Sequence, residues 1–218
     1  MVGTFTLYID AFWSNCWDCG PYVALREKGV PFSTAIALLR EGAITPGARR
    51  AITGLAPALQ HGSFWLAESS AIIEYLEEIL PPPEWPALLP AAPQLRARAR
   101  QLMSWLRCEI DQLRMERDST LIFYPTADLP PLTPLAARQA ERLVEIVLRL
   151  EPSPHGALLG DWCIADVDVA FALMRLVRSQ HELPAAVRAY AEAVWARPAV
   201  REYVEHARPP HPPSPPPR

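Results

Sequence analysis

Residues 14 to 29, SNCWDCGPYVALREKG, place five side chains that could act on a thiol within six positions: Ser14, Asn15, Cys16, Asp18 and Cys19. A hydroxyl or an amide donates a hydrogen bond to a thiolate, whereas a cysteine of lowered pKa can itself attack a disulfide. The stretch follows a strand-like run and enters a helical pattern, and the positive end of a helix favours a thiolate. These residues therefore indicate thiol chemistry, either on a bound thiol or on the cysteines themselves.

The number and spacing of the cysteines and histidines argue against a disulfide framework and against a metal site. Four cysteines in 218 residues are too few for a disulfide framework, so we interpret Cys16 and Cys19 as reduced thiols. Cys108 and Cys163 lie in apolar helical patterns and are expected in the core. The five histidines are scattered, and none has a Cys, Asp or Glu at metal-ligand spacing. We expect no metal site.

Composition also narrows the class of protein. The charge is nearly balanced, with 21 Lys and Arg against 24 Asp and Glu, and no stretch combines basic with aromatic residues. Nucleic acid is therefore not an expected partner. No segment reaches the roughly 18 continuous apolar residues of a membrane span, and the N-terminus has no apolar signal core. We expect a cytoplasmic protein with no membrane partner.

The chain around the thiol-directed residues reads as strand, helix, strand. Residues 4–10 alternate apolar and polar side chains, which is the period of a half-buried strand. A helix should follow, with Pro21 in its first turn and Gly29 as its C-terminal stop. Residues 31–38 resemble a second strand, so the order predicts a parallel crossover.

Two more strands and a helix complete the first part. After a weakly helical stretch, 41–54, the segments 57–61 and 63–67 are predicted to form a hairpin. The helix that follows should have Ser69 or Ser70 as its N-cap.

A proline-rich segment then separates two kinds of structure. Residues 81–93 contain six prolines in thirteen positions, which excludes a regular element. Beyond this linker all periodicity is helical. The expected helices span 94–117, Thr133 to about Leu150, Cys163 to Val177, and two shorter segments opened by Pro184 and Pro198.

With this layout the chain resembles a cytosolic glutathione transferase over roughly residues 4–206. Three stretches carry the resemblance: residues 54–59 (GLAPAL), 66–72 (LAESSAI) and 160–166 (GDWCIAD). The segments ARARQLMSWLR, RMERDSTLIF and GDWCIADVD further resemble a bacterial branch of the family with transferase and glutathione-dependent peroxidase activity. The resemblance implies an α/β thioredoxin-like N-terminal domain followed by an all-α helical-bundle domain.

The implied domain boundaries follow the composition. Residues 1–80 form the thioredoxin-like domain, 81–93 the linker and 94–206 the helical substrate domain. Residues 207–218 lack apolar side chains to pack and are expected to form a disordered proline-rich tail.

The resemblance also assigns the glutathione contacts. Pro57 is expected in the cis form, so that Ala56 offers its backbone N–H and C=O to the cysteinyl unit of glutathione. Ser69, where a strand ends and a helix begins, is expected to bind the γ-glutamyl carboxylate, and Glu68 the amine. Leu55 stands where the family often has a basic or amide residue. The contact to the glycyl carboxylate is therefore assigned to Arg50, with Arg40 and Arg49 as alternatives.

The residue that holds the thiolate stays open among three neighbours. In the resembling proteins the catalytic serine or cysteine stands fourteen residues before the end of the first helix, and counting back from Gly29 gives Asn15. Ser14 takes this place if the loop has one extra residue, and Cys16 is one position late. Either Asn15 or Ser14 would serve, because the role is to donate a hydrogen bond to the thiolate. Asn15 is our first candidate.

Two rival functions remain. Cys16 and Cys19 form a CxxC motif at the start of the first helix, where disulfide oxidoreductases of thioredoxin-like fold keep theirs. The chain could also be a non-catalytic binding protein on a transferase fold. We expect instead a detoxifying glutathione transferase whose thiolate attacks small electrophiles or organic hydroperoxides.

The resemblance implies a homodimer with the helix from Ser70 near its interface. The electrophile's pocket is assigned to the start of the first helix and to the long helix of the second domain. Its expected wall residues are Trp13, Trp105, Ile110 and Arg114.

Overall fold

The first domain is a four-stranded sheet with two helices on one face. The computed structural model describes residues 3–38, 43–126 and 129–210. Strands β1 (Phe5–Asp10) and β2 (Phe32–Leu38) pair in parallel, and β3 (Ala58–His61) and β4 (Phe64–Ala67) form an antiparallel hairpin beside β1. The strand order is β2-β1-β3-β4, so the predicted crossover and hairpin are confirmed.

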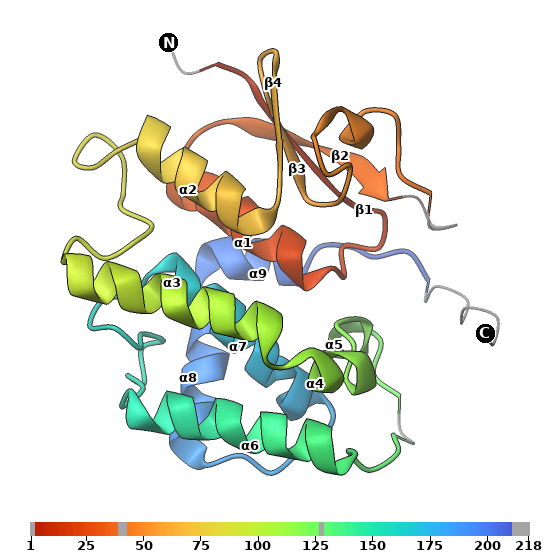
Figure 1. Ribbon diagram of the computed structural model, residues 1–218, viewed down its shortest axis with the longest axis vertical. Coiled ribbons are helices and arrows are strands. Elements are labelled where there is room, and N and C mark those ends of the chain that lie inside the picture. The colour runs from red at the N-terminus through yellow and green to blue at the C-terminus, as the bar shows by residue number, and fades with distance from the viewer. Residues whose placement is uncertain (1–2, 39–42, 127–128, 211–218) are drawn as a thin grey trace.

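Helices α1 (Cys16–Glu27) and α2 (Ser69–Ile79) lie between the sheet and the second domain (Figure 1). A Cβ on Gly20 of α1 would come within 3.2 Å of Ile73 and 3.5 Å of Asp168. The missing side chain thus lets α1 approach both α2 and the second domain closely. Buried apolar side chains form one continuous cluster through the two domains.

The start of α1 differs from the prediction. The Asn15 side chain accepts a hydrogen bond from the backbone N–H of Trp17 at 3.1 Å, so the helix begins at Cys16. Pro21 therefore lies inside the helix. The prediction that it lies in the first turn is wrong. The helix ends at Glu27 with Lys28 as its C-cap, and the predicted stop, Gly29, follows with a φ of 66° that suits glycine.

Other local predictions on the first domain need correction. The N-cap of α2 is Glu68, with a φ of 73°, and neither Ser69 nor Ser70 caps the helix. Of the stretch predicted as weakly helical, residues 41–42 lie outside the described residues. In the remainder, a short 3₁₀ turn, η1 (Ala48–Arg50), is the helical element that the structure describes.

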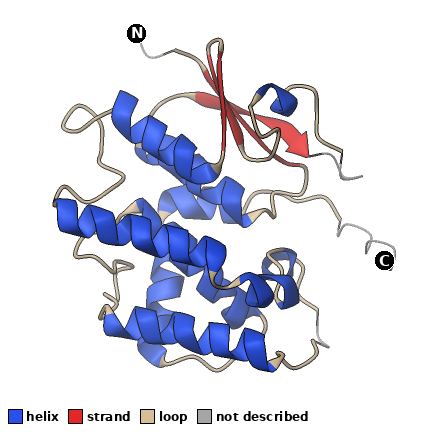
Figure 2. Cartoon of the chain, in the orientation of Figure 1, coloured by secondary structure: helices blue, strands red, loops and turns tan. Residues whose placement is uncertain are grey.

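The second domain is all-helical (Figure 2). Its helices are α3 (Pro93–Cys108), α4 (Asp111–Glu116), α5 (Thr120–Phe123), α6 (Pro134–Arg149), α7 (Ile164–Arg178), α8 (Ala185–Trp195) and α9 (Pro198–Val204). Thr133 caps α6 as predicted, and α7 is buried on nearly all sides. The predicted fold class, a thioredoxin-like domain followed by an all-helical domain, is confirmed.

The single helix predicted over 94–117 is wrong, because the chain breaks between α3 and α4 at Ile110. Contacts from α6 stabilise the break. The side chain of Gln139 accepts a hydrogen bond from the N–H of Leu113 and donates one to Asp111, both at 2.8 Å. The break leaves the N–H of Leu113 without a partner inside the helix, and Gln139 of α6 provides one. Local sequence patterns do not reveal such a contact between distant segments.

The linker has no helix or strand between α2 and α3, as predicted. Lys28, buried at the end of α1, fixes the linker to the first domain. Its ammonium group donates to the carbonyls of Leu80 at 2.7 Å and Pro86 at 2.8 Å and pairs with Glu77. No helix in the described part of the chain is long and apolar enough to cross a membrane. The cytoplasmic location stays a prediction.

Candidate functional site

The loop between β1 and α1 is wound around one carboxylate. Asp10 accepts hydrogen bonds from the backbone N–H groups of Phe12 at 2.7 Å, Ser14 at 2.9 Å and Asn15 at 2.8 Å. Trp13, between them, has a φ of 53°. These bonds fix the backbone that presents the three candidate thiol-directed residues.

Asn15 and Ser14 are held close to this carboxylate. The Asn15 amide nitrogen donates to Asp18 at 2.8 Å while its oxygen caps α1, which leaves one amide hydrogen for a ligand. Ser14 is buried. Burial, with the neighbouring charge of Asp10, raises the pKa of Asp18 well above its ordinary value. The assignment of either residue to the thiolate stays a prediction.

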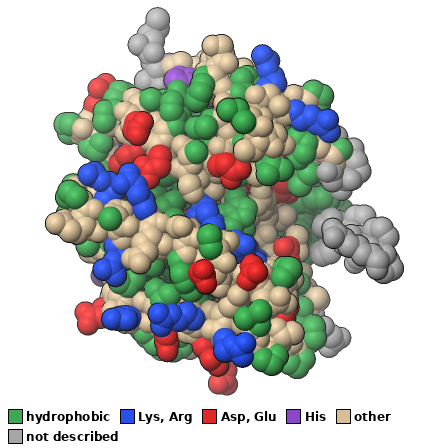
Figure 3. Space-filling view, viewed as in Figure 1, with side chains coloured by type: hydrophobic (Ala, Val, Ile, Leu, Met, Phe, Trp, Pro, Cys, Tyr) green, Lys and Arg blue, Asp and Glu red, His purple; other side chains and the backbone are tan. Residues whose placement is uncertain are grey.

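A cavity of about 270 Å³ brings four of the predicted glutathione contacts together. Its walls are Ala56 and Pro57 before β3, Glu68 and Ser69 at the start of α2, and Trp17, Arg107 and Arg114. The Ala56–Pro57 peptide bond is cis, as the resemblance implies. Figure 3 shows basic side chains in this region, between the first domain and α3 and α4.

Arg107 ties the walls of this cavity to the second domain. It donates to the hydroxyl of Ser69 at 2.9 Å and to the carboxylate of Asp168, on α7, at 2.9 Å. Its guanidinium lies 4.5 Å from the ring of Trp17. Burial raises the pKa of Asp168, and the charge of Arg107 opposes that shift.

A second, small cavity of about 10 Å³ also has Trp17 in its wall. Cys16, Ile110 and Arg114 line it together with Arg175 of α7. The Arg175 guanidinium donates to the Cys16 sulfur at 3.1 Å. Burial raises the pKa of the Cys16 thiol, although Arg175 acts in the opposite direction. Of the predicted pocket residues, Ile110 lines this cavity and Arg114 lines both cavities.

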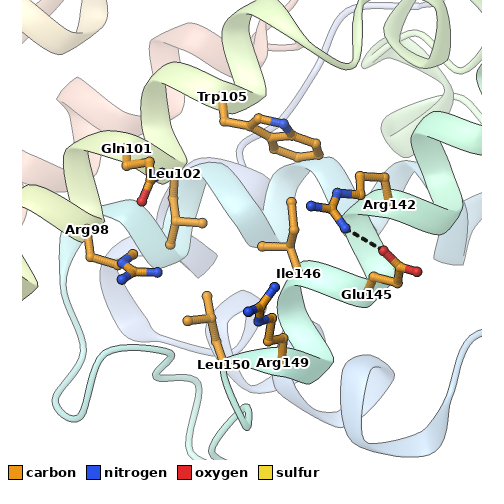
Figure 4. A pocket seen from close by; sticks show the side chains of 9 residues that line it. All are labelled: Arg98, Gln101, Leu102, Trp105, Arg142, Glu145, Ile146, Arg149 and Leu150. Carbon is orange, nitrogen blue, oxygen red and sulfur yellow. Dashed lines mark hydrogen bonds and ion pairs between the residues drawn. The ribbon is translucent and has the colours of Figure 1, made fainter.

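Trp13 and Trp105, the other two predicted pocket residues, lie elsewhere. Trp13 is buried and stacks on His206 with ring centroids 3.6 Å apart. Trp105 faces a groove of about 660 Å³ between α3 and α6, together with Leu102 and Ile146 (Figure 4). It falls on the face of α3 that carries residues 98, 101 and 102, whereas Arg107 is on the face toward α1.

Arg50 does not line the cavity of about 270 Å³. It is exposed, and its guanidinium lies 5.0 Å from the ring centroid of Trp65. Arg49 donates to the carbonyl of Ile44, and Arg40 lies outside the described residues. The contact of Arg50 with the glycyl carboxylate stays a prediction, while Arg107 and Arg114 are the arginines at the cavity.

Sequence reasoning missed four residues of the site: Trp17, Arg107, Asp168 and Arg175. A signal for two of them was present, since Asp168 and Arg175 are charged residues in a helix that is otherwise read as apolar on nearly all sides. Charged side chains are rarely buried unless they have partners or a function.

The four cysteines are free. Cys19 and Cys163 are buried, whereas Cys108 is exposed, contrary to our prediction of a core position. Among the residues that the structure describes, no group of three or more His, Cys, Asp or Glu could hold a metal ion.

Comparison with known families agrees with this geometry. The family model for the C-terminal domain of glutathione S-transferases matches residues 93–208, and the model for the N-terminal domain matches residues 21–79. The chain belongs to the glutathione S-transferase family.

Three relatives of this glutathione S-transferase are informative. A glutathione transferase homolog from Burkholderia, solved with bound glutathione, is 35% identical with a TM-score of 0.77, covering 93% of this chain and 97% of that one. A maleyl pyruvate isomerase, a bacterial transferase of the Zeta class, is 27% identical with a TM-score of 0.70, covering 94% and 99%. A curated maleylpyruvate isomerase from Ralstonia is 36% identical over 108 residues, 49% of this chain and 50% of that protein. The chain thus spans about half the length of this curated relative.

The C-terminal segment of this transferase family member returns to the loop before α1. Arg208 donates twice to the carbonyl of Trp13, at 3.0 and 3.1 Å, and also to the carbonyl of Tyr203. The hydroxyl of Tyr203 donates to the carbonyl of Asn15 at 3.1 Å. The predicted tail therefore begins later than residue 207, and residues 211–218 lie outside the described part of the chain.

We predict that Arg208→Met lowers the free energy of unfolding by about 1–3 kcal/mol, because it removes hydrogen bonds from a charged donor to buried carbonyls. Urea denaturation measures the loss. Arg201→Met is the matched control, since Arg201 is exposed on α9 and pairs with exposed Glu205. Equal stability of the two variants would contradict the role of Arg208.

Proposed function

We propose that this protein is a glutathione-dependent enzyme that activates the thiol of glutathione for attack on a small electrophile. One observation carries the proposal. Ala56, Pro57, Glu68 and Ser69 line a single cavity of about 270 Å³ beside Trp17, at the start of α1. Membership of the family and the glutathione bound to the Burkholderia homolog support it.

The proposed contacts use groups that the cavity offers. The Ser69 hydroxyl accepts from Arg107, so its own hydrogen is available to a ligand carboxylate. Glu68 is exposed, and its carboxylate can accept a hydrogen bond from the ammonium group of the γ-glutamyl unit. The backbone of Ala56 is assigned to the cysteinyl unit, which directs the thiol toward the N-terminus of α1.

We assign the thiolate to Asn15 first and to Ser14 second. A hydrogen bond to a charged group contributes about 1.5–3 kcal/mol, which lowers a thiol pKa by about one to two units. The N-terminus of α1 acts in the same direction. No proton acceptor on the protein is required, since the thiolate then dominates near neutral pH.

A disulfide oxidoreductase based on Cys16 and Cys19 is less well supported. Burial raises the pKa of Cys16 and raises that of Cys19 well above its ordinary value. Cys19 is fully buried in α1. Because a thiolate is the nucleophile in thiol–disulfide exchange, such cysteines react slowly at neutral pH.

A glutathione-dependent isomerase is the second candidate, supported by the two maleylpyruvate isomerase relatives. The thiolate would add to a carbon–carbon double bond, and elimination after rotation would return glutathione unchanged. Peroxide reduction and detoxification are further outcomes of the same activated thiolate and remain proposals.

We also propose a homodimer with α2 near its interface. Phe64 of β4 is 47% exposed and Leu95 of α3 is 41% exposed, and both elements adjoin the α2 side of the molecule. Light scattering over a range of concentrations tests this assembly. A monomer mass at all concentrations would contradict it.

We predict that Glu68→Ala and Ser69→Ala each weaken glutathione binding by about 1–3 kcal/mol, because each removes a bond to a charged group of the ligand. Calorimetric titration measures the change. Ser63→Ala, in the exposed β3–β4 turn, is the control and should bind as the wild type does. Absence of binding heat in the wild type at millimolar glutathione would contradict the proposed function.

We predict that Asn15→Ala raises the pKa of enzyme-bound glutathione by about one to two units, because the thiolate loses a hydrogen-bond donor. Thiolate absorbance across a pH series measures this pKa, and Ser14→Ala tests the alternative donor. Cys16→Ser should have a smaller effect, with Cys108→Ser at the exposed end of α3 as control. Full conjugation rates in both Ala variants combined with an inactive Cys16→Ser would favour the oxidoreductase.

A further inference from the structure

Two arginines at the start of α1 lack a carboxylate partner. Arg175 is 3% exposed in the last turn of α7, and it donates to the carbonyl of Arg117 at 2.6 Å and to the sulfur of Cys16 at 3.1 Å. Arg114 is half-buried and donates a hydrogen bond to the carbonyl of Leu106 at 3.2 Å. Neither arginine forms an ion pair with any residue that the structure describes.

The carboxylates around these arginines are engaged or distant. Asp168, the buried carboxylate of the site, is paired with Arg107 at 2.9 Å. Asp111 and Asp118 are exposed, and they interact electrostatically with Arg114 and with Cys16, respectively, without forming an ion pair with either arginine. Near the three arginines 107, 114 and 175 there is therefore one buried carboxylate among the described residues, that of Asp168, and it is paired with Arg107. Buried charges in proteins are normally paired, so this excess of positive charge is suited to an anion that arrives with a ligand.

Apolar side chains make up most of the wall around Arg114 and Arg175. Both line the small cavity with Leu106, Ile110 and Phe171, and Asp168, which is paired with Arg107, lines it as well. Trp17, whose ring centroid lies 5.3 Å from the Arg114 guanidinium, lines both this cavity and the one assigned to glutathione. Walls of this kind fit a compound with an apolar body and a negatively charged end.

We propose that Arg114 and Arg175 bind a carboxylate of the second substrate, so that the electrophile is an organic acid. This inference rests on the proposed function and specifies its substrate class. Guanidinium groups match carboxylates in geometry as well as charge. The cavity of about 10 Å³ is too small for such a substrate as it stands. Arg114 lines both cavities, and its movement toward the carboxylate would join the small one to the glutathione cavity of about 270 Å³.

Two aryl chlorides that differ by a carboxylate test the proposal. In chlorodinitrobenzene and chlorodinitrobenzoate, the thiolate of glutathione forms a carbon–sulfur bond and chloride leaves with the bonding electrons. We expect kcat/KM of the wild type to favour the benzoate. Arg114→Met and Arg175→Met should lower the ratio of the two kcat/KM values by about tenfold or more, through a higher KM for the benzoate. Arg178→Met, at the exposed end of the same helix, should leave the ratio unchanged.

The outcomes separate this inference from the proposed function. No heat of glutathione binding and no turnover of either chloride would overturn the proposed function. Turnover of both chlorides without preference for the benzoate, or with a ratio that Arg114→Met leaves unchanged, would overturn the inference alone. So would a loss of glutathione affinity in Arg114→Met with an unchanged ratio, because Arg114 would then bind a carboxylate of glutathione. Arg114 is half-buried on α4, so its variant keeps the test valid if Arg175→Met does not fold.

Discussion

The geometry of the site depends on one guanidinium group, that of Arg107. It connects α3 with Asp168 of α7 and with Ser69 of α2, and it stacks on Trp17 of α1. Asp168 is buried, which raises its pKa, so the ionised carboxylate is tolerated there because this partner is present. The same contact orients the Ser69 hydroxyl toward the cavity. An ion pair between helices of the second domain thereby orients Ser69 of the first domain, the residue proposed to bind the ligand carboxylate.

The loop before α1 is likewise shaped by both domains. From the first domain, the Asp10 carboxylate accepts three backbone N–H groups, a pattern that substitutes for regular structure. From the second, Tyr203 and Arg208 bind the carbonyls of Asn15 and Trp13. The candidate thiolate donors are therefore positioned by residues more than 180 positions apart in the sequence. Such a loop is more rigid than its lack of secondary structure indicates.

Sequence patterns predicted what depends on local interactions. Strand alternation, the stop at Gly29 and the Thr133 cap each depend on a few neighbouring residues, and all were found as expected. The motif residues Pro57 and Ser69 were also brought to one cavity. What failed depends on contacts between distant segments. The break at Ile110 is stabilised by Gln139. Trp13 lies in the loop before α1, where it stacks on His206, and Trp105 lies on the face of α3 toward α6. Arg175 was missed because the pattern of apolar residues predicts that α7 is buried but does not predict the role of a charged side chain within it.

The electrostatics of the site distinguish a bound thiolate from one on the protein. Burial opposes ionisation of Cys16 and Cys19 and raises the pKa of both thiols, although Arg175 acts in the opposite direction at Cys16. The 270 Å³ cavity is more open, and its arginines, 107 and 114, face any ligand directly. A thiolate carried in by a ligand thus meets positive charge without the burial that penalises the protein's own cysteines. The CxxC motif can therefore lie at the start of α1 while the chemistry belongs to the sulfur of a bound ligand.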